Sequence, residues 1–149
     1  MIRQIEHRDI STLLDLGYEM HQEGHFKHTD YDLTKVTHLF TSIIEDDDKC
    51  CFIVEKDGKI IGFFMGYITE YYFGKDLTSY DLLLYVDQKH RGGRTGIKLL
   101  QCYIKWAKSW GVKDIRLGDS AEIDSEAVGR LFKFMGFREH GKLYILDKG

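Results

Sequence analysis

The sequence lacks proline altogether, has only three cysteines and contains no apolar run of the about 18 residues that a membrane-spanning helix needs. Its polar start, MIRQIEHRDI, is unlike a signal peptide, which has an apolar centre. The cysteines form no CxxC pair, and we expect all three to be reduced and packed in the interior, as in a cytoplasmic protein. These absences predict a protein that does not associate with a membrane.

A surplus of basic residues is also missing. The chain has 21 Lys and Arg against 24 Asp and Glu, so its formal net charge at pH 7 is −3. Nucleic-acid-binding domains usually carry a basic face, so this balance argues against nucleic acid as a partner. A slightly acidic protein suits a cationic acceptor better.

The composition predicts one globular domain. The chain has 149 residues, close to the common size of a domain, of which 43% are hydrophobic and 30% charged. No linker, repeat or low-complexity segment divides it, so we expect a single domain over residues 1–149.

The spacing of apolar residues predicts a mixed α/β architecture. A strand at 2–5 is followed by two helices, then by three strands, and the second half alternates helix and strand. The dipeptide Asp57–Gly58 predicts a hairpin turn of the primed type between strands at 50–56 and 59–69. We expect residues 137–140 and 143–146 to close the chain as a second hairpin.

The stretch from Leu84 to Leu100 carries the clearest chemical signal. A buried strand ends at Val86, the turn HRGGRTG follows, and an amphipathic helix begins. The first turn of a helix has free backbone N–H groups and a partial positive charge, and glycines let a ligand approach that backbone closely. Arg91 and Arg94 can add charge-assisted hydrogen bonds. The pattern indicates a site for an anion such as a pyrophosphate.

Other glycine motifs fit this turn less well. It lacks the Gly-Lys-Ser/Thr ending of a P-loop and the GxGxxG of dinucleotide-binding folds. Its single RGG lies between ordered elements, unlike an RNA-binding tail. On the motif alone, an ordinary tight turn between a strand and a helix is the alternative interpretation.

The same stretch resembles the coenzyme A signature of the GNAT superfamily of N-acetyltransferases. In that signature a strand ending in valine precedes Arg/Gln-x-x-Gly-x-Gly/Ala, which opens a helix with a Leu-Leu pair. Val86, Arg91, Gly96 and Leu99–Leu100 fall on it. Arg94 stands where the first motif glycine is expected, and the resulting RGGR resembles phage-encoded members. The ending LFKFMGF resembles the family's last helix, and the order of elements matches over nearly the whole chain.

The resemblance implies an α/β fold of the GNAT type, with a mixed, mostly antiparallel sheet of about six to seven strands flanked by about four helices. It also implies acetyl-CoA as cosubstrate, its pantetheine arm on the strand backbone and its pyrophosphate in the turn. Ser125 takes the place of an asparagine that often faces the cofactor, and Phe132 that of a tyrosine that protonates the leaving thiolate. The implied cofactor-binding residues are Leu84, Tyr85, Val86, Arg91, Gly92, Gly93, Arg94, Thr95, Gly96, Ser125 and Phe132.

Acyl transfer to an amine needs an acceptor for the amine proton, stabilisation of the developing oxyanion and departure of the thiolate. Asp81 is the candidate base, because it lies next to the position of a catalytic glutamate in some family members; the alternative is a solvated carboxylate. Asp81 and Tyr85 are expected to share one face of the strand, about 13 Å apart at ~3.3 Å per residue. Because Phe132 has no proton to donate, Tyr85 and Ser120 are candidate donors. Weaker candidates for a base acting through water are Glu70 and Asp119.

The acceptor is left open between a small-molecule amine and a protein lysine or N-terminus, and a homodimer is compatible with the sequence. Two loops that line the acceptor groove in the resembling family carry His25, Phe26, Tyr31 and Tyr71–Tyr72–Phe73. Packing of surface aromatic rings is the alternative interpretation of these residues.

No metal site is expected, because no carboxylate or cysteine completes a ligand set around His21, His25 and His28. The main hypothesis is therefore an N-acetyltransferase that moves an acetyl group from acetyl-CoA directly to a primary amine in a ternary complex. The alternative is a catalytically silent acyl-CoA-binding sensor or interaction module on the same fold, which Phe132 favours.

Overall fold

Five strands form one sheet in the order β1-β2-β3-β4-β5, antiparallel except for the parallel pair β4 and β5. The computed structural model describes residues 1–119 and 122–148. The strands are β1 (Ile2–Gln4), β2 (Lys49–Lys56), β3 (Lys59–Glu70), β4 (Leu77–Val86) and β5 (Asp114–Ile115). The helices are α1 (Ile10–Glu23), α2 (Leu33–Glu45), α3 (Thr95–Ser109) and α4 (Ser125–Phe134), with 3-10 turns η1 (His7–Asp9), η2 (His25–His28) and η3 (Gln88–His90).

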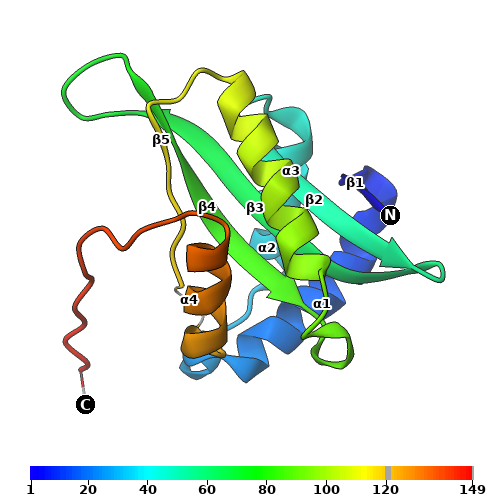
Figure 1. The fold of residues 1–149 in the computed structure, drawn as a ribbon. Helices are drawn as coiled ribbons and strands as arrows, with labels where there is room; N and C mark the ends of the chain where they lie inside the picture. The colour runs from blue at the N-terminus through cyan, green and yellow to red at the C-terminus, as the bar shows by residue number, and fades with distance from the viewer. Residues whose placement is uncertain (120–121, 149) are drawn as a thin grey trace.

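The β2–β3 hairpin forms where its turn residues predict it. Asp57 and Gly58 both have positive φ, 53° and 78°, as a primed turn requires, and Lys56 pairs with Lys59 across it. These two strands and β4 make up most of the sheet, and they bring the chain to the glycine turn that precedes α3 (Figure 1).

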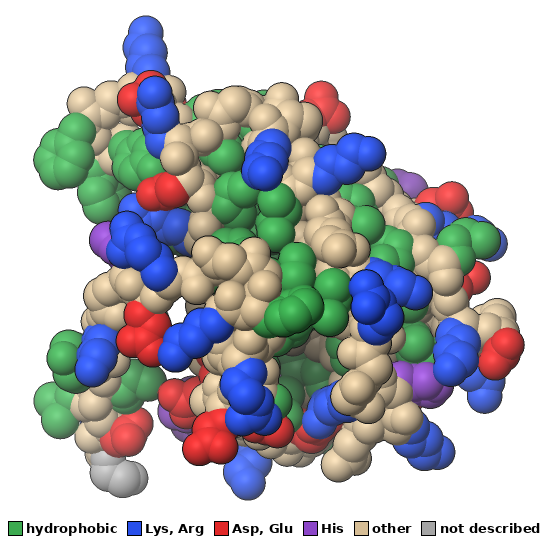
Figure 2. Space-filling model, in the orientation of Figure 1, with side chains coloured by type: hydrophobic (Ala, Val, Ile, Leu, Met, Phe, Trp, Pro, Cys, Tyr) green, Lys and Arg blue, Asp and Glu red, His purple; other side chains and the backbone are tan. Residues whose placement is uncertain are grey.

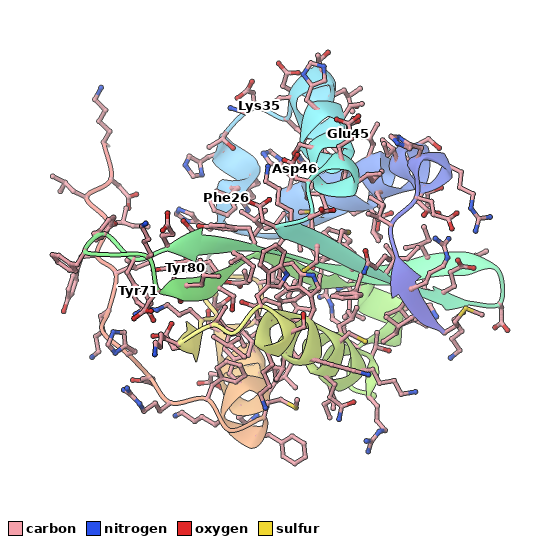
Figure 3. All side chains as sticks on the ribbon, turned by 90° about the horizontal axis from the view of Figure 1, so that it is seen from above. Phe26, Lys35, Glu45, Asp46, Tyr71 and Tyr80 are labelled. Atoms are coloured by element: carbon pink, nitrogen blue, oxygen red, sulfur yellow. The ribbon has the colours of Figure 1, made fainter. Side chains whose placement is uncertain are left out.

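The helices cover the two faces of the sheet in pairs. Seen edge-on, the sheet has α1 and α2 on one side and α3 and α4 on the other (Figure 3). Two cores result, because side chains alternate between the faces along a strand. One core includes Leu13, Phe40 and Phe63 beneath α1 and α2, and the other includes Phe64 and Leu99 beneath α3.

Strand β4 contains a β-bulge that interrupts this alternation. Met65 of β3 pairs with Leu83, whereas the next residue, Gly66, pairs with Asp81, so Leu82 is the extra residue on β4. Leu82 and Leu83 consequently both pack against the α1–α2 core, and Leu84 packs against the α3 core. The bulge separates β4 into two parts whose side chains are out of phase.

The described sheet has fewer strands than the six to seven predicted. No strand forms within residues 137–148, which run away from α4 as an extended tail (Figure 1). The predicted hairpin around Gly141 is polar near its turn, at Glu139, His140 and Lys142, and an isolated two-stranded hairpin is marginally stable. The neighbouring β5 has two residues and gives it a short edge to pair with.

No helix in residues 1–119 and 122–148 is long and apolar enough to cross a membrane. Lys and Arg side chains are scattered over the visible face and interspersed with Asp and Glu (Figure 2). The three thiols are free; Cys50 and Cys51 are buried and Cys102 is half-buried.

Candidate functional site

A cleft opens where β4 and β5 part. In the described residues β5 pairs only with Thr78 and Ser79, and beyond this point β4 continues without β5 beside it. The resulting cleft is small, with a cavity volume of about 30 Å³, and it is partly open to solvent. It is lined by Asp81, Leu82, Leu83, Leu84, Gly118, Asp119, Val128 and Phe132. The bulge, the segment after β5 and helix α4 therefore meet at one cavity.

Asp81 is a half-buried carboxylate on the wall of this cleft. Its Oδ1 accepts a hydrogen bond from the backbone N–H of Gly118 at 3.0 Å, which ties β4 to the segment after β5. Burial raises the pKa of Asp81 to about 6, although the bond from Gly118 acts in the opposite direction. A carboxylate with this pKa is ionised at neutral pH and can accept a proton, so it fits the predicted base.

Tyr85 lies on the other face of the sheet, and the prediction that it shares a face with Asp81 is wrong. The bulge at Leu82 shifts the alternation, so the Tyr85 ring packs in the α1–α2 core against Phe63. Its hydroxyl donates to Oε1 of Glu23 at 2.5 Å. Burial, and then the Glu23 carboxylate, raise the pKa of Tyr85 well above its usual value. This hydroxyl does not line the cleft in which a thiolate would leave.

The glycine turn forms as predicted at the N-terminus of α3. Gly92 has a φ of 88°, a conformation that favours glycine, and a Cβ atom added at Gly92 or Gly93 would meet no other atom within 4 Å. Arg94 occupies the N-cap position, is exposed, and is followed by Thr95, the first residue of the helix. This turn leads into a 15-residue helix, and the backbone N–H groups at the N-terminus of such a helix suit an anionic group.

Gly96 has a further, structural role. A Cβ atom at this position would meet Cδ2 of Leu131 at 3.1 Å, so the absence of a side chain lets α3 approach α4 closely. This approach brings α4, with Phe132 on the cleft, next to the glycine turn. Phe132 therefore lines the cleft, as its position in the sequence predicts, but its ring has no proton to donate to a leaving thiolate.

Arg91 is held by the protein. Its Nε donates to the Val86 carbonyl at 2.8 Å, and its two terminal nitrogens lie 2.9 and 2.8 Å from the two oxygens of Glu23. The guanidinium carbon is 5.3 Å from the centre of the Tyr85 ring. Hydrogen bonding with Arg91 lowers the pKa of Glu23, so the pair is ionised at neutral pH.

The remaining predicted residues divide between the cleft and its surroundings. Leu84 lines the cleft, while Val86 packs in the α3 core and Ser125 is the exposed first residue of α4. Asp119 lines the cleft, and Glu70 ends β3 outside it. Ser120 lies outside the described residues.

The predicted aromatic groove residues do not form one cluster. Phe26 lies on the α1–α2 side of the sheet, and Tyr71 and Tyr80 lie at the end where β3 and β4 are joined (Figure 3). Arg116 is stacked over both tyrosine rings, at 6.0 and 5.6 Å. Tyr31 has a structural role, because its hydroxyl donates to the Leu14 carbonyl. Tyr72 and Phe73 are fully exposed at the tip of the connection.

Sequence reasoning missed Glu23, Gly118 and Leu82. Glu23 is 68 residues from Arg91, and a glutamate at the end of an amphipathic helix looks like a solvated residue. The bulge has no clear signal in the sequence, because Leu82, Leu83 and Leu84 are identical and their order does not show which of them is the extra residue. Among residues 1–119 and 122–148, no group of three or more His, Cys, Asp or Glu side chains could hold a metal ion.

The geometry describes a class of protein: an α/β domain with a cleft between two parting strands, a helix N-terminus suited to an anion, and a half-buried carboxylate with a raised pKa. A family model described as acetyltransferase (GNAT) family matches residues 11–137. The chain belongs to this family of acetyltransferases, as its glycine turn predicts. Phage origin stays a prediction.

Solved structures share the fold at low sequence identity. A ribosomal-protein-alanine N-acetyltransferase from Brucella melitensis biovar Abortus 2308 is 16% identical with a TM-score of 0.74, and 99% of each chain is covered. The aminoglycoside N-acetyltransferase AAC(6')-Iy in complex with CoA is 16% identical with a TM-score of 0.81, covering 99% of this chain and 93% of the other. A predicted acetyltransferase with acetyl-CoA from Clostridium acetobutylicum is 18% identical with a TM-score of 0.77, covering 99% and 95%. No curated protein sequence matches the chain significantly.

Proposed function

We propose that this protein is an N-acetyltransferase that moves the acetyl group of acetyl-CoA directly to a primary amine while both are bound. The observation that carries the proposal is the cleft between β4 and β5, which places the carboxylate of Asp81 beside the bulge and next to α4. The solved structures with CoA or acetyl-CoA share the fold over nearly the whole chain, which supports the choice of cosubstrate.

The cofactor would lie across the mouth of the cleft. Its pyrophosphate would accept hydrogen bonds from the backbone of Gly92 to Gly96, with Arg94 adding charge. Its pantetheine arm would follow the part of β4 that runs on without β5, at Leu84. Asp81 lines the same cleft as Leu84, so its carboxylate would be available to a thioester held there.

The reaction then needs one proton acceptor and one leaving group. The amine lone pair attacks the thioester carbon and forms the N–C bond, and the nitrogen proton passes to the Asp81 carboxylate, directly or through water. The C–S bond breaks and the coenzyme A sulfur leaves with the electron pair as a thiolate. A thiol of pKa near ~8.5 leaves tolerably at neutral pH, so the hydrocarbon ring of Phe132 does not prevent the step.

The acceptor is a primary amine on a small molecule or on a protein lysine or N-terminus. The structural relatives include enzymes named for an aminoglycoside and for a ribosomal-protein alanine, which supports an amine without choosing between these classes. The free thiols and the cosubstrate suit the cytoplasm. No part of the proposal requires a metal ion.

Release of free thiol from acetyl-CoA in the presence of an amine panel tests the activity. Gly93→Asp tests the cofactor site, because it adds a negative charge in open space at a position without positive φ. We expect the parent and Gly93→Ala to bind CoA in a calorimetric titration, and Gly93→Asp to lose binding while its circular dichroism spectrum is unchanged. Equal affinity of both variants would contradict the site.

The same experiment separates an enzyme from a silent acyl-CoA-binding module. Binding of acetyl-CoA by the parent without thiol release in the presence of any amine would favour the module. Mass spectrometry of a cell extract incubated with the protein and acetyl-CoA would identify the acetylated product if the protein is an enzyme.

A further inference from the structure

Glu23, Tyr85 and Arg91 form a charged cluster on the side of the sheet opposite the cleft. Glu23 accepts hydrogen bonds from the Tyr85 hydroxyl at 2.5 Å and from Arg91 at 2.9 Å. The second Glu23 oxygen lies 2.8 Å from the other terminal nitrogen of Arg91. The carboxylate therefore binds both arms of the guanidinium, the geometry in which an Arg–carboxylate pair is strongest and most directional.

The cluster lies at the protein surface, where its two charged side chains are partly covered. The Glu23 side chain is 25% exposed and that of Arg91 33%, and the guanidinium lies over the Tyr85 ring. Tyr85 itself is buried in the α1–α2 core, so it fixes the carboxylate from below. Partly desolvated pairs with a third, rigid partner resist screening by salt better than pairs in free solvent.

The elements that the cluster joins are distant in sequence. Glu23 is the last residue of α1, while Arg91 begins the glycine turn, 68 residues later. Arg91 also donates to the Val86 carbonyl at the end of β4. The guanidinium of Arg91 thus ties the start of the turn to two elements: to β4 through the Val86 carbonyl and to α1 through Glu23.

An arginine engaged in this way has little left to offer a phosphate. Three of its nitrogens have protein partners, and its charge is balanced by Glu23. Arg94, by contrast, is exposed at the N-cap of α3 and makes no side-chain capping hydrogen bond, at the end of the helix where an anion would bind.

We propose that Glu23 is a positioning residue for the cofactor: through Arg91 it holds residues 87–94 against α1, so that the N–H groups at the start of α3 are ordered before acetyl-CoA arrives. This inference rests on the proposed function. Pre-ordering lowers the cost of binding, so loss of the pair raises Kd and KM for the cofactor. The chemistry occurs at Asp81 on the other face, so kcat changes little.

The experiment measures CoA affinity by calorimetry in four proteins: the parent, Glu23→Gln, Arg91→Gln and the double variant. Glu19→Gln, which removes the same charge from the same helix one turn earlier, is the matched control. We expect each single variant to raise Kd on the order of tenfold, the double variant to be no worse than either, and the control to match the parent. Exchange of the charges in Glu23→Arg with Arg91→Glu should restore part of the affinity.

The sign of the effect decides the interpretation. If Arg91 leaves Glu23 to bind the pyrophosphate, Glu23→Gln would free Arg91 and tighten CoA binding, and this result would overturn the proposal. An unchanged Kd in both single variants would overturn it as well. Calorimetry at a temperature where each variant is fully folded reports on folded molecules only, so a loss of global stability does not imitate the result. A parent that binds no CoA would instead refute the proposed function. In the steady state, a fall in kcat with unchanged KM for acetyl-CoA would also contradict a positioning role.

Discussion

Replacing Asp81 by Asn should make the folded protein more stable and the enzyme slower. Burial raises the pKa of this carboxyl from 3.8 to about 6. The folded state therefore keeps the Asp81 proton at pH values where the unfolded chain has lost it, and rising pH destabilises the folded state between these two values. At 1.36 kcal/mol per pKa unit, the ionised carboxylate costs about 3 kcal/mol of folding free energy above pH 6.

The pH dependence provides the test. Asn carries no charge and keeps an oxygen that can accept from Gly118, so the variant escapes this cost without losing the bond. We expect the gain in unfolding free energy to be about 3 kcal/mol at pH 8 and about half of that at pH 5, because about half of the penalty has developed at pH 5. Urea unfolding of both proteins, followed by circular dichroism at the two pH values, measures the difference.

Glu126→Gln is the control, since its side chain is 94% exposed on α4 and its replacement removes the same charge. A gain that is equal at pH 5 and pH 8 would refute a raised pKa at Asp81. In the same variant, kcat/KM for the amine should fall at least tenfold at neutral pH and recover in part as the pH rises and more amine is deprotonated. Overlapping pH–rate profiles would remove Asp81 from the mechanism.

Two further predictions concern the cofactor site. Arg94→Ala should weaken the binding free energy of CoA by about 1.5–3 kcal/mol if the guanidinium binds a phosphate, and calorimetric titration measures this value. A change below about 0.5 kcal/mol would mean that the Arg94 side chain contacts solvent and not the cofactor. Phe132→Tyr restores a hydroxyl on the cleft, and because the thiolate leaves unaided we expect kcat to change far less than the about 10²-fold that a needed general acid supplies. A gain of that size in steady-state assays would show that proton donation limits the parent enzyme.

Local signals in the sequence predicted the framework of the site. Asp57–Gly58 determines its hairpin without help from distant residues, and the glycine turn with its helix is also encoded within a few positions. The predictions that depended on contacts across the chain were less successful. The prediction that Tyr85 shares a face with Asp81 failed because β4 holds one extra residue between them, and the partner of Arg91 is on a helix that no spacing connects to it.

The end of the chain is a second case in which local sequence did not decide the structure. Residues 143–146 have the composition of a strand, and their side chains are 63–98% exposed in the structure. Strand propensity describes a residue that fits a half-buried surface, and it does not supply that surface. The short β5 provides little of it, so the closing hairpin could not be decided from its own residues.

The bulge in β4 adds one leucine to the strand while Asp81 and Tyr85 keep the faces that their partners on β3 give them. Removing either Leu82 or Leu83 would leave a strand of the same chemical character, with one leucine fewer. The deletion would remove the bulge, and Asp81, Leu84 and Tyr85 would keep their partners on β3 and their faces of the sheet. What would be lost is one of the two adjacent leucines that pack against the α1–α2 core. Substitutions of similar volume at these leucines keep that packing, whereas loss of a single codon in the gene would remove one side chain from this core and leave the site on its own face.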